Sequence, residues 1–364
     1  MKAGIVGLPN VGKSTLFNCL SNAKAQSANF PFCTIEPNIG VVNVPDPRIA
    51  RLEELVKPER VQMATVDIVD IAGLVKGASK GEGLGNQFLG NIRECNAIIH
   101  VLRCFDNDNI VHVDGNVNPI RDKETIDIEL QLKDLETVEK RLEKTNRAAK
   151  TGNKEAQAEK ALLDRIRETL LEGKSARTVV PQNQDEEEML ESFQLITTKP
   201  VLYVCNVDEA SAVNGNKYVD QVREMVKDEN AEVIVLSVGA EADITELESY
   251  EERQMFLQDM GLTEPGSAVL IRAAYKLLNL QTYFTAGVKE VRAWTINIGD
   301  TAPKAAGVIH TDFEKGFIRA EVIAFDDYSN FGSEAKVKEA GKLRVEGKEY
   351  IVKDGDVMHF RFNV

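Results

Sequence analysis

The sequence predicts an α/β fold with a mostly parallel sheet, which is interrupted by a helical pair and followed by a compact α+β module. Four apolar, strand-like runs before residue 240 each end at a short polar motif, as expected when ligand sites lie at the carboxyl ends of parallel strands. Between two of these runs the apolar residues change to helical spacing, with charges in the gaps. Beyond about residue 278, alternating runs separated by glycine and aspartate turns predict strands again.

Length and composition define the broad class of protein. At 364 residues with a formal net charge of −14, the chain is long enough for two or three domains and too acidic to coat nucleic acid as a whole. Its five cysteines show neither CxxC pairing nor framework spacing, which favours free thiols in a reducing cytoplasm. A strand begins at Lys2 with no signal peptide before it, and no apolar run approaches a membrane span. We therefore expect a cytoplasmic protein without a membrane partner.

The first motif is a phosphate-binding loop, Gly7-Leu-Pro-Asn-Val-Gly12-Lys13-Ser14, between a strand at 3–6 and a helix at 14–23. Its two glycines allow backbone N–H groups to turn toward phosphate oxygens at a helix N-terminus. Lys13 is expected to reach the β- and γ-phosphates and to serve catalysis, and the Ser14 hydroxyl to ligate Mg²⁺. The chain is therefore predicted to bind a nucleoside triphosphate through six consecutive residues: Asn10, Val11, Gly12, Lys13, Ser14 and Thr15.

Two further motifs predict a nucleotide switch. Asp70-Ile-Ala-Gly73 ends the apolar strand at 64–69, where the aspartate would hold Mg²⁺ through water and the Gly73 N–H would contact the γ-phosphate. The glycine-rich segment that follows suits an element ordered by a bound γ-phosphate. Upstream, the loop 29–38 offers Thr34 as a second hydroxyl ligand for Mg²⁺, with a turn cap as its alternative role. Neighbouring Cys33 is either an inert thiol or an oxidation-sensitive one near the metal.

The base-reading element departs from the usual guanine-binding pattern. Asn206-Val207-Asp208-Glu209 follows an apolar strand at 201–205, where GTPases carry Asn-Lys-x-Asp. Val207 replaces the lysine that packs on the base, and Glu209 is one methylene longer than the aspartate that accepts hydrogen bonds from guanine. Misplacing that carboxylate costs roughly 1–3 kcal/mol, a tenfold to hundredfold loss of guanine preference. After the strand at 232–236, the segment Ser237-Val238-Gly239 fits the last base-contacting loop.

The rest of the chain divides into two parts. Residues 125–171 follow a helical spacing that breaks at 151–153, which predicts two long antiparallel helices inserted into the nucleotide domain. A helix at 267–280 precedes strands at 291–296, 321–325 and 357–362. Residues 278–364 hold twelve Lys or Arg against thirteen Asp or Glu, so this module is nearly neutral. That charge is compatible with an RNA-contacting face, for which the candidates are Lys304, Lys315, Arg319, Lys342 and Arg344.

Together these motifs resemble those of the YchF/Obg-like ATPase family, a branch of the GTPase superfamily. The resemblance covers essentially the whole chain and extends to 70–79, 283–294, 310–313 and 353–356. It implies ATP preferred over GTP, slow Mg²⁺-dependent hydrolysis, and association with ribosomes or their subunits, through RNA and protein, without DNA. It also implies three domains: a G domain at 1–127 and 199–277, a helical coiled-coil insertion at 128–198, and a TGS domain of ubiquitin-like β-grasp fold at 278–364.

The residue that orients the attacking water is not evident from the motifs. Leu74 stands where many GTPases place a water-orienting glutamine, and a leucine side chain cannot hydrogen-bond water. We therefore expect slow turnover or a group recruited from elsewhere. His112 follows the strand at 97–102 and is one hypothesis for that group, with a purely structural loop histidine as the equal alternative. Asn10 stands where related switches coordinate K⁺, which makes K⁺ a second, weaker cofactor hypothesis.

Three functions stay open at this point. The first is an ATPase whose hydrolysis drives switching on a ribosomal or translational partner. The second is a nucleotide-gated binding module in which hydrolysis is incidental, and Leu74 favours it unless a partner accelerates turnover. The third is a GTPase in ribosome assembly, which requires the Glu209 carboxylate to accept the hydrogen bonds from guanine that an aspartate accepts in other GTPases.

Overall fold

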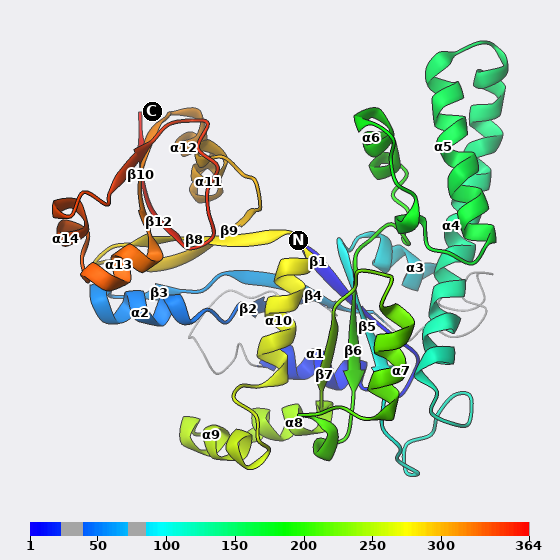
Figure 1. The fold of residues 1–364 in the computed structure, drawn as a ribbon, viewed down its shortest axis with the longest axis horizontal. Helices are drawn as coiled ribbons and strands as arrows, with labels where there is room; N and C mark the ends of the chain where they lie inside the picture. The colour runs from blue at the N-terminus through cyan, green and yellow to red at the C-terminus, as the bar shows by residue number, and fades with distance from the viewer. Residues whose placement is uncertain (23–38, 72–84, 364) are drawn as a thin grey trace. The chain divides into compact units, whose positions relative to one another are not determined.

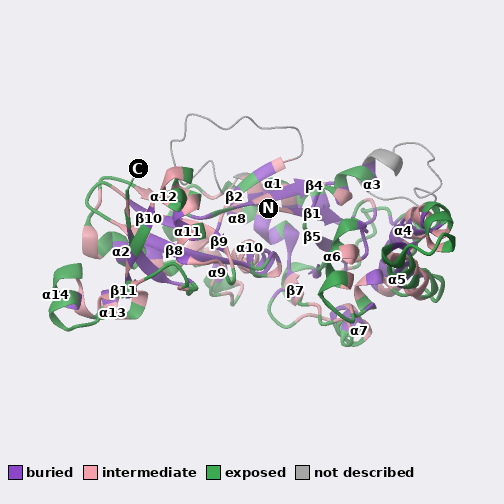
Figure 2. Cartoon of the chain, turned by 90° about the horizontal axis from the view of Figure 1, so that it is seen from above, coloured by how far each residue is buried: buried purple, intermediate pink, exposed green. Residues whose placement is uncertain are grey.

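The computed structural model describes residues 1–22, 39–71 and 85–363. Contacts divide the chain into two compact units, one formed by residues 1–40 and 67–270, the other by 41–66 and 271–364. Figure 2 shows that the strands of both units are mostly buried, while exposed residues concentrate on helices and loops. In the described part of the chain, no helix combines the length and the apolar character that a membrane crossing requires.

The first unit is centred on a sheet with strand order β2-β4-β1-β5-β6-β7 (Figure 1). Neighbouring strands from β4 to β7 are parallel, so the segments that follow them meet at one edge of the sheet. β5 and β6 are buried along their whole length, which explains their continuous apolar runs. The predicted mostly parallel sheet is confirmed. Its strands are β1 (Lys2–Val6), β2 (Ile39–Asn43), β4 (Thr65–Asp70), β5 (Ala97–Arg103), β6 (Val201–Asn206) and β7 (Val233–Leu236).

Helices follow most of these strands. α1 and α8 contact each other, and α4 contacts both β5 and α7. Polar side chains cap several of them; Asn216, for example, accepts from two backbone N–H groups at the start of α7. The helices of this unit, apart from the inserted ones, are α1 (Lys13–Asn22), α3 (Gly85–Arg93), α7 (Lys217–Val226), α8 (Val238–Glu246) and α9 (Tyr250–Asp259), and α10 (Gly266–Leu277) spans the boundary at residue 270.

The predicted helical pair is present as α4 (Pro119–Lys150) and α5 (Lys154–Leu171), which Figure 1 shows as a hairpin extending well past the sheet. The helices meet through an apolar seam that includes Val138, Leu142, Leu162 and Ile166. α4 starts before the predicted residue 125, because Asn118 caps it and Pro119 fits its first turn. The acidic run at 185–188 lies in α6 (Gln184–Ser192), and part of it forms the first turn, where it complements the helix dipole.

The base of the hairpin is tied to the parallel sheet. Asp134 of α4 is buried and accepts hydrogen bonds from the backbone N–H groups of Ile196 and Thr197 at 2.8 and 2.7 Å, just before β6. Burial raises the pKa of the Asp134 carboxyl, while these hydrogen bonds lower it. The inserted helices therefore belong to the same compact unit as the nucleotide domain.

The second unit contains a mixed sheet of order β11-β10-β12-β8-β9-β3. β8 pairs antiparallel with β9 and parallel with β12, and α11 packs beside β9 and β10 over a common apolar core. This arrangement is the expected β-grasp. Trp294 packs against that core, as predicted, and the Arg292 guanidinium lies 3.7 Å from its ring centre. Its elements are α2 (Pro47–Val56), β3 (Val61–Gln62), β8 (Leu280–Ala286), β9 (Val291–Asn297), α11 (Ala302–Ile309), α12 (Thr311–Lys315), β10 (Phe317–Ala324), α13 (Phe325–Phe331), α14 (Glu334–Glu339), β11 (Arg344–Glu346) and β12 (Asp356–Phe362).

The compact units divide the chain differently from the expected domains. The sequence assigned residues 41–66 to the nucleotide domain, whereas the contacts group them with residues 271–364, although β2 and β4, whose residues lie partly in this range, pair in the first sheet. β3 pairs parallel with β9, and Arg48 of α2 forms an ion pair with Asp354 at 2.7 Å. Both contacts join residues more than 200 positions apart, and no local pattern in the sequence announces them.

Candidate nucleotide-binding site

The phosphate loop lies between β1 and α1, as predicted. Gly12 has φ +100°, and a Cβ there would come within 2.6 Å of the Asn206 amide nitrogen. Glycine is therefore required at this position by backbone conformation and by space. The Leu16 N–H donates to the Gly12 carbonyl at 2.9 Å, which starts α1 directly after the loop. Residues 10–15 thus place backbone N–H groups at a helix N-terminus, the arrangement that binds phosphate.

Lys13 is buried and its ammonium donates to the Leu8 carbonyl oxygen at 2.8 Å. Burial lowers the pKa of Lys13 to about 8, although the nearby Asp70 carboxylate raises it. Below that pH the side chain carries a positive charge inside a largely desolvated loop. A polyphosphate is the kind of ligand that such a charge attracts.

Two side chains with oxygen donors come together between α1 and β4. The Ser14 hydroxyl donates to Asp70 Oδ2 at 3.2 Å, while Asp70 Oδ1 is buried and finds no hydrogen-bond partner among the described residues. Burial raises the pKa of Asp70, against the opposing effects of Ser14 and Lys13. Oxygen donors of this kind suit a hard divalent cation. The other predicted members of this site, Thr34 and Gly73, lie outside the described residues, as do Cys33 and Leu74.

Asn206 holds two parts of the site together. Its side-chain nitrogen donates to the Val11 carbonyl at 2.9 Å, and its oxygen accepts from the Val238 N–H at 3.0 Å. Asn206 is itself buried, so this base-motif residue positions the phosphate loop against the loop after β7. Ser237 caps α8 by accepting from the Ala240 N–H at 3.3 Å. The structure thus brings the 206 and 237–239 motifs together.

The two unusual base-motif residues have different surroundings. Val207 is buried and its N–H donates to the Leu236 carbonyl, so its side chain forms part of the core. Glu209 is exposed and begins a short 3₁₀ helix, η3 (Glu209–Ser211), which Asp208 caps by accepting from the Ser211 N–H. The carboxylate of Glu209 therefore extends beyond the edge of the sheet, and it reaches one methylene further than the carboxylate of an aspartate would.

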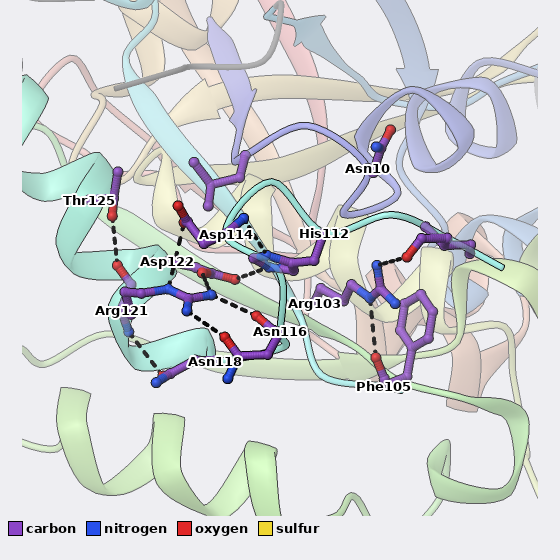
Figure 3. A network of polar contacts seen from close by, with 12 residues as sticks. Asn10, Arg103, Phe105, His112, Asp114, Asn116, Asn118, Arg121, Asp122 and Thr125 are labelled. Atoms are coloured by element: carbon purple, nitrogen blue, oxygen red, sulfur yellow. Dashed lines mark hydrogen bonds and ion pairs between the residues drawn. The ribbon is translucent and has the colours of Figure 1, made fainter. Parts of the chain in front are cut away.

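The loop after β5 is held by Arg103, the last residue of that strand, which belongs to none of the sequence motifs. This arginine is buried and donates to the carbonyl oxygens of Phe105, Asn107 and Ile110 at 3.2, 3.0 and 2.9 Å. Figure 3 shows the guanidinium inside the curve of the loop. Its place in the sequence is informative, because an arginine at the end of an apolar strand is buried and its charge then needs several hydrogen-bond partners.

His112 lies in this loop, and both of its ring nitrogens have partners. Nε2 lies 2.8 Å from Asp122 Oδ2, and Nδ1 accepts from the Asp114 N–H at 3.1 Å. Arg121 completes the network by donating to Asp122 Oδ1 at 3.1 Å and to Asn116 Oδ1 at 2.7 Å (Figure 3). His112, Asp114 and Asp122 have the spacing of a metal site, but the Arg121 guanidinium already compensates the carboxylate charge. No local pattern in the sequence indicates that Arg121 and Asp122 contact the histidine.

The loop also touches the phosphate loop. The Asn10 side-chain nitrogen donates to the Val111 carbonyl oxygen at 3.2 Å, and Asn10 has a left-handed backbone with φ 64°. The candidate histidine is therefore adjacent in sequence to a residue that contacts the phosphate site. His100, by contrast, is buried in β5, as expected for a core residue, and His310 and His359 lie in the second unit.

The fold and this site define a P-loop nucleoside triphosphatase of the GTPase type. Residues 2–151 match the family model described as "50S ribosome-binding GTPase", and residues 280–363 match the YchF GTPase C-terminal model, described as "Protein of unknown function (DUF933)". A Haemophilus ducreyi protein named Ribosome-binding ATPase YchF is 58% identical over 363 residues, covering 100% of this chain and 99% of the relative. A Bacillus subtilis protein of the same name is 54% identical over 366 residues, covering 100% of both.

A solved structure has the same architecture. The structure of the Schizosaccharomyces pombe YchF GTPase superposes with a TM-score of 0.89 at 39% identity, covering 99% of this chain and 97% of the other. The chain belongs to the YchF family, as the sequence motifs indicated.

Proposed function

We propose that this protein is a ribosome-binding ATPase that slowly hydrolyses ATP to ADP and phosphate and uses the bound nucleotide as a switch in translation. The observation that carries the proposal is the convergence of Lys13, Ser14 and Asp70 on one phosphate site beside a base motif without the guanine-specific residues. The curated relatives named Ribosome-binding ATPase support the ribosomal partner. Such a partner implies a cytoplasmic location.

In the proposed reaction a water oxygen bonds to the γ-phosphorus while the bond from that phosphorus to the β–γ bridging oxygen breaks. The phosphate product and solvent take up the proton of the water. Lys13 places a positive charge beside the β- and γ-phosphates, and the N–H groups of residues 10–15 orient them. Mg²⁺, when bound, supplies further neutralisation of the phosphate charge; Ser14 and Asp70 would hold it, together with Thr34. Gly73 would contact the γ-phosphate.

His112 is the proposed group that orients the water. A neutral imidazole accepts a hydrogen bond from water through a nitrogen without a proton. In the described structure both nitrogens are occupied by Asp122 and Asp114. Nδ1 accepts the Asp114 N–H and is therefore the nitrogen without a proton, so the ring must leave both Asp122 and Asp114 before it can accept a hydrogen bond from water.

A preference for ATP follows from the base motif. Val207 is buried in the core, and Glu209 extends one methylene further than the aspartate that pairs with guanine. In the proposed last base-contacting segment, Ser237 to Gly239, the Val238 N–H already donates to Asn206 and the Ser237 hydroxyl caps α8. Competition of ATP and GTP for the full chain with Mg²⁺ tests the assignment: ATP is expected to bind more tightly, and tighter GTP binding would establish the alternative, a GTPase of ribosome assembly.

The surface for the ribosome is proposed on the helical hairpin and on the TGS domain. Of the candidate RNA-contacting residues, Arg344 is engaged by Glu346 and Asp356, and Lys304 lies 3.8 Å from Asp300. Lys315, Arg319 and Lys342 are exposed, and in the described part of the chain none of them lies in an ion pair. They are therefore the basic side chains most available to phosphate.

A nucleotide-gated binding module with incidental hydrolysis is the second candidate function. It is favoured by the hydrogen bonds that occupy both ring nitrogens of His112.

K⁺ beside Asn10 is a further proposal, since the Asn10 side chain lies at the edge of the phosphate loop. Replacing K⁺ by Na⁺ in the hydrolysis assay tests this cofactor. Slower turnover in Na⁺ is expected if K⁺ takes part in hydrolysis, and equal rates in the two salts would exclude K⁺ as a cofactor.

A further inference from the structure

In the loop that carries His112, the usual pattern of burial is reversed: the apolar side chains are exposed and the polar one is buried. The flanking apolar residues Val111 and Val113 are 74% and 52% exposed, whereas the polar His112 is 8% exposed. Apolar burial cannot hold this arrangement, because the apolar side chains face solvent. Polar contacts therefore hold the loop, and those of the histidine keep its ring buried; polar contacts can be exchanged for other hydrogen bonds at small net cost.

The main contact comes from the inserted helix. Asp122 lies in the first turn of α4 and its side chain is 1% exposed, as buried as the histidine ring it meets. Because Nδ1 of His112 accepts the Asp114 N–H, the proton of a neutral ring is assigned to Nε2, which donates to the carboxylate. Figure 3 shows the imidazole directed toward Asp122 and α4 rather than toward Asn10 of the phosphate loop.

Asp122 is itself fixed by a neighbour. Arg121 donates to the second carboxylate oxygen and also contacts Asn116 and Asp114. A carboxylate with both oxygens bound keeps one orientation, and a charge-assisted hydrogen bond is stronger than a neutral one. At the other end of the loop Arg103 holds three carbonyl groups independently of the histidine. The loop can therefore lose the Asp122 contact without losing its attachment to β5.

We propose that Asp122 is a positioning residue: it holds His112 in a resting place on α4, and hydrolysis requires release of that contact. This inference rests on the proposed role of His112 in orienting water. It assigns a function to the start of the insertion, because anything that shifts the first turn of α4 changes the availability of the imidazole. The basal rate of the free protein is then set partly by how often the contact opens.

The test compares ATP hydrolysis by the full chain and by Asp122→Asn, which keeps the shape of the side chain and removes its charge. We expect kcat to rise about threefold to tenfold with KM for ATP unchanged, since a charge-assisted hydrogen bond becomes a neutral one. Glu124→Gln is the matched control on the same helix, because Glu124 is an exposed carboxylate two residues away; its kcat should equal that of the parent. The increase must also disappear in the Asp122→Asn, His112→Ala double variant.

Two results separate the possible failures. If His112→Ala lowers kcat but Asp122→Asn leaves it unchanged or reduces it, the resting contact is overturned and the role of His112 stands. If His112→Ala turns over as fast as the parent, the role of the histidine fails and this inference fails with it.

A spectroscopic measurement covers the case in which the aspartate variant does not fold. Nitrogen-15 NMR of histidine-labelled parent protein, with His112→Ala for assignment, should show His112 as the Nε2–H tautomer. A ring protonated at Nδ1, or one in rapid exchange between tautomers, would overturn the proposal.

Discussion

The side-chain nitrogen of Asn206 donates a hydrogen bond to the carbonyl oxygen of Val11 at 2.9 Å, across nearly 200 residues of sequence. The same side chain accepts from the Val238 N–H. One amide thus links the phosphate loop, the base motif and the loop after β7. The nucleotide site is a single hydrogen-bonded assembly at the edge of the sheet.

Asn206→Ala is therefore expected to weaken ATP and GTP binding to a similar extent, by about tenfold to a hundredfold. The reason is that the Val11 carbonyl and the Val238 N–H lose a buried partner, at a cost of about 1–3 kcal/mol. Titration calorimetry with both nucleotides measures the change. Asn214→Ala, an exposed asparagine in the same region, should bind like the parent, and a selective loss of one nucleotide would show that Asn206 reads the base instead.

Glu209→Asp should shift the balance of affinities toward GTP by about tenfold. Shortening the side chain by one methylene retracts the carboxylate to the position from which an aspartate pairs with guanine. Competition binding measures the ratio of the two dissociation constants. Glu209→Gln, which keeps the length and removes the charge, should bring no gain for GTP; an equal gain in both variants would contradict a geometric origin of the preference.

Asp70→Asn should raise the Mg²⁺ concentration that gives half-maximal hydrolysis by about tenfold to a hundredfold, the usual effect of losing an outer-sphere carboxylate. The cause is the loss of the charge next to Ser14, whose hydroxyl lies 3.2 Å from Asp70. A Mg²⁺ titration of the ATPase rate provides the measurement. Asp67→Asn on the same strand is the control, and an unchanged Mg²⁺ requirement in Asp70→Asn would remove this residue from the metal site.

Arg103→Lys should lower the free energy of unfolding by about 2–4 kcal/mol, because a lysine cannot satisfy three carbonyl groups in the plane of a guanidinium. Urea denaturation followed by circular dichroism measures the loss. Arg147→Lys, on the exposed face of α4, should change stability by less than about 0.5 kcal/mol. If both variants have the same free energy of unfolding as the parent, Arg103 does not organise the loop.

His100 makes the stability of the first unit depend on pH. Burial lowers the pKa of His100 to about 3, with Lys123, Arg177 and Lys13 acting in the same direction and Glu229 opposing them. In the unfolded chain the group titrates near 6.5, so below that pH only the unfolded state takes up the proton and stability falls until about pH 3.

The expected loss from this group between pH 7.5 and pH 5.5 is about 1.4 kcal/mol. Urea denaturation of the parent and of His100→Phe at both pH values isolates it, because the variant should lack that part of the decline. His359→Gln, at an exposed position in the second unit, should keep the parent's pH dependence. An identical decline in His100→Phe would mean that another group is responsible.

Much of the fold was predictable because its signals are local. The apolar runs of β1, β5 and β6 are nearly continuous, since parallel strands are buried on both faces. The break at 151–153 correctly separated α4 from α5. The pairing of β3 with β9 was not predictable, because a two-residue strand has no periodicity to detect.

The site divides in the same way. Lys13, Ser14, Asp70 and Asn206 belong to motifs whose spacing is fixed by backbone geometry, and their placement follows from the sequence. Asp122 and Arg103 act through contacts that depend on where α4 begins and how the loop turns. Their roles arise from tertiary structure, so no local pattern could identify them.

The most direct test of the proposed function is the rate of ATP hydrolysis by the full chain with and without purified ribosomes, at saturating ATP and Mg²⁺. We expect a slow basal rate that ribosomes raise several-fold in the parent and not in His112→Ala. A rate that ribosomes leave unchanged, or a stimulation seen only with GTP, would contradict it.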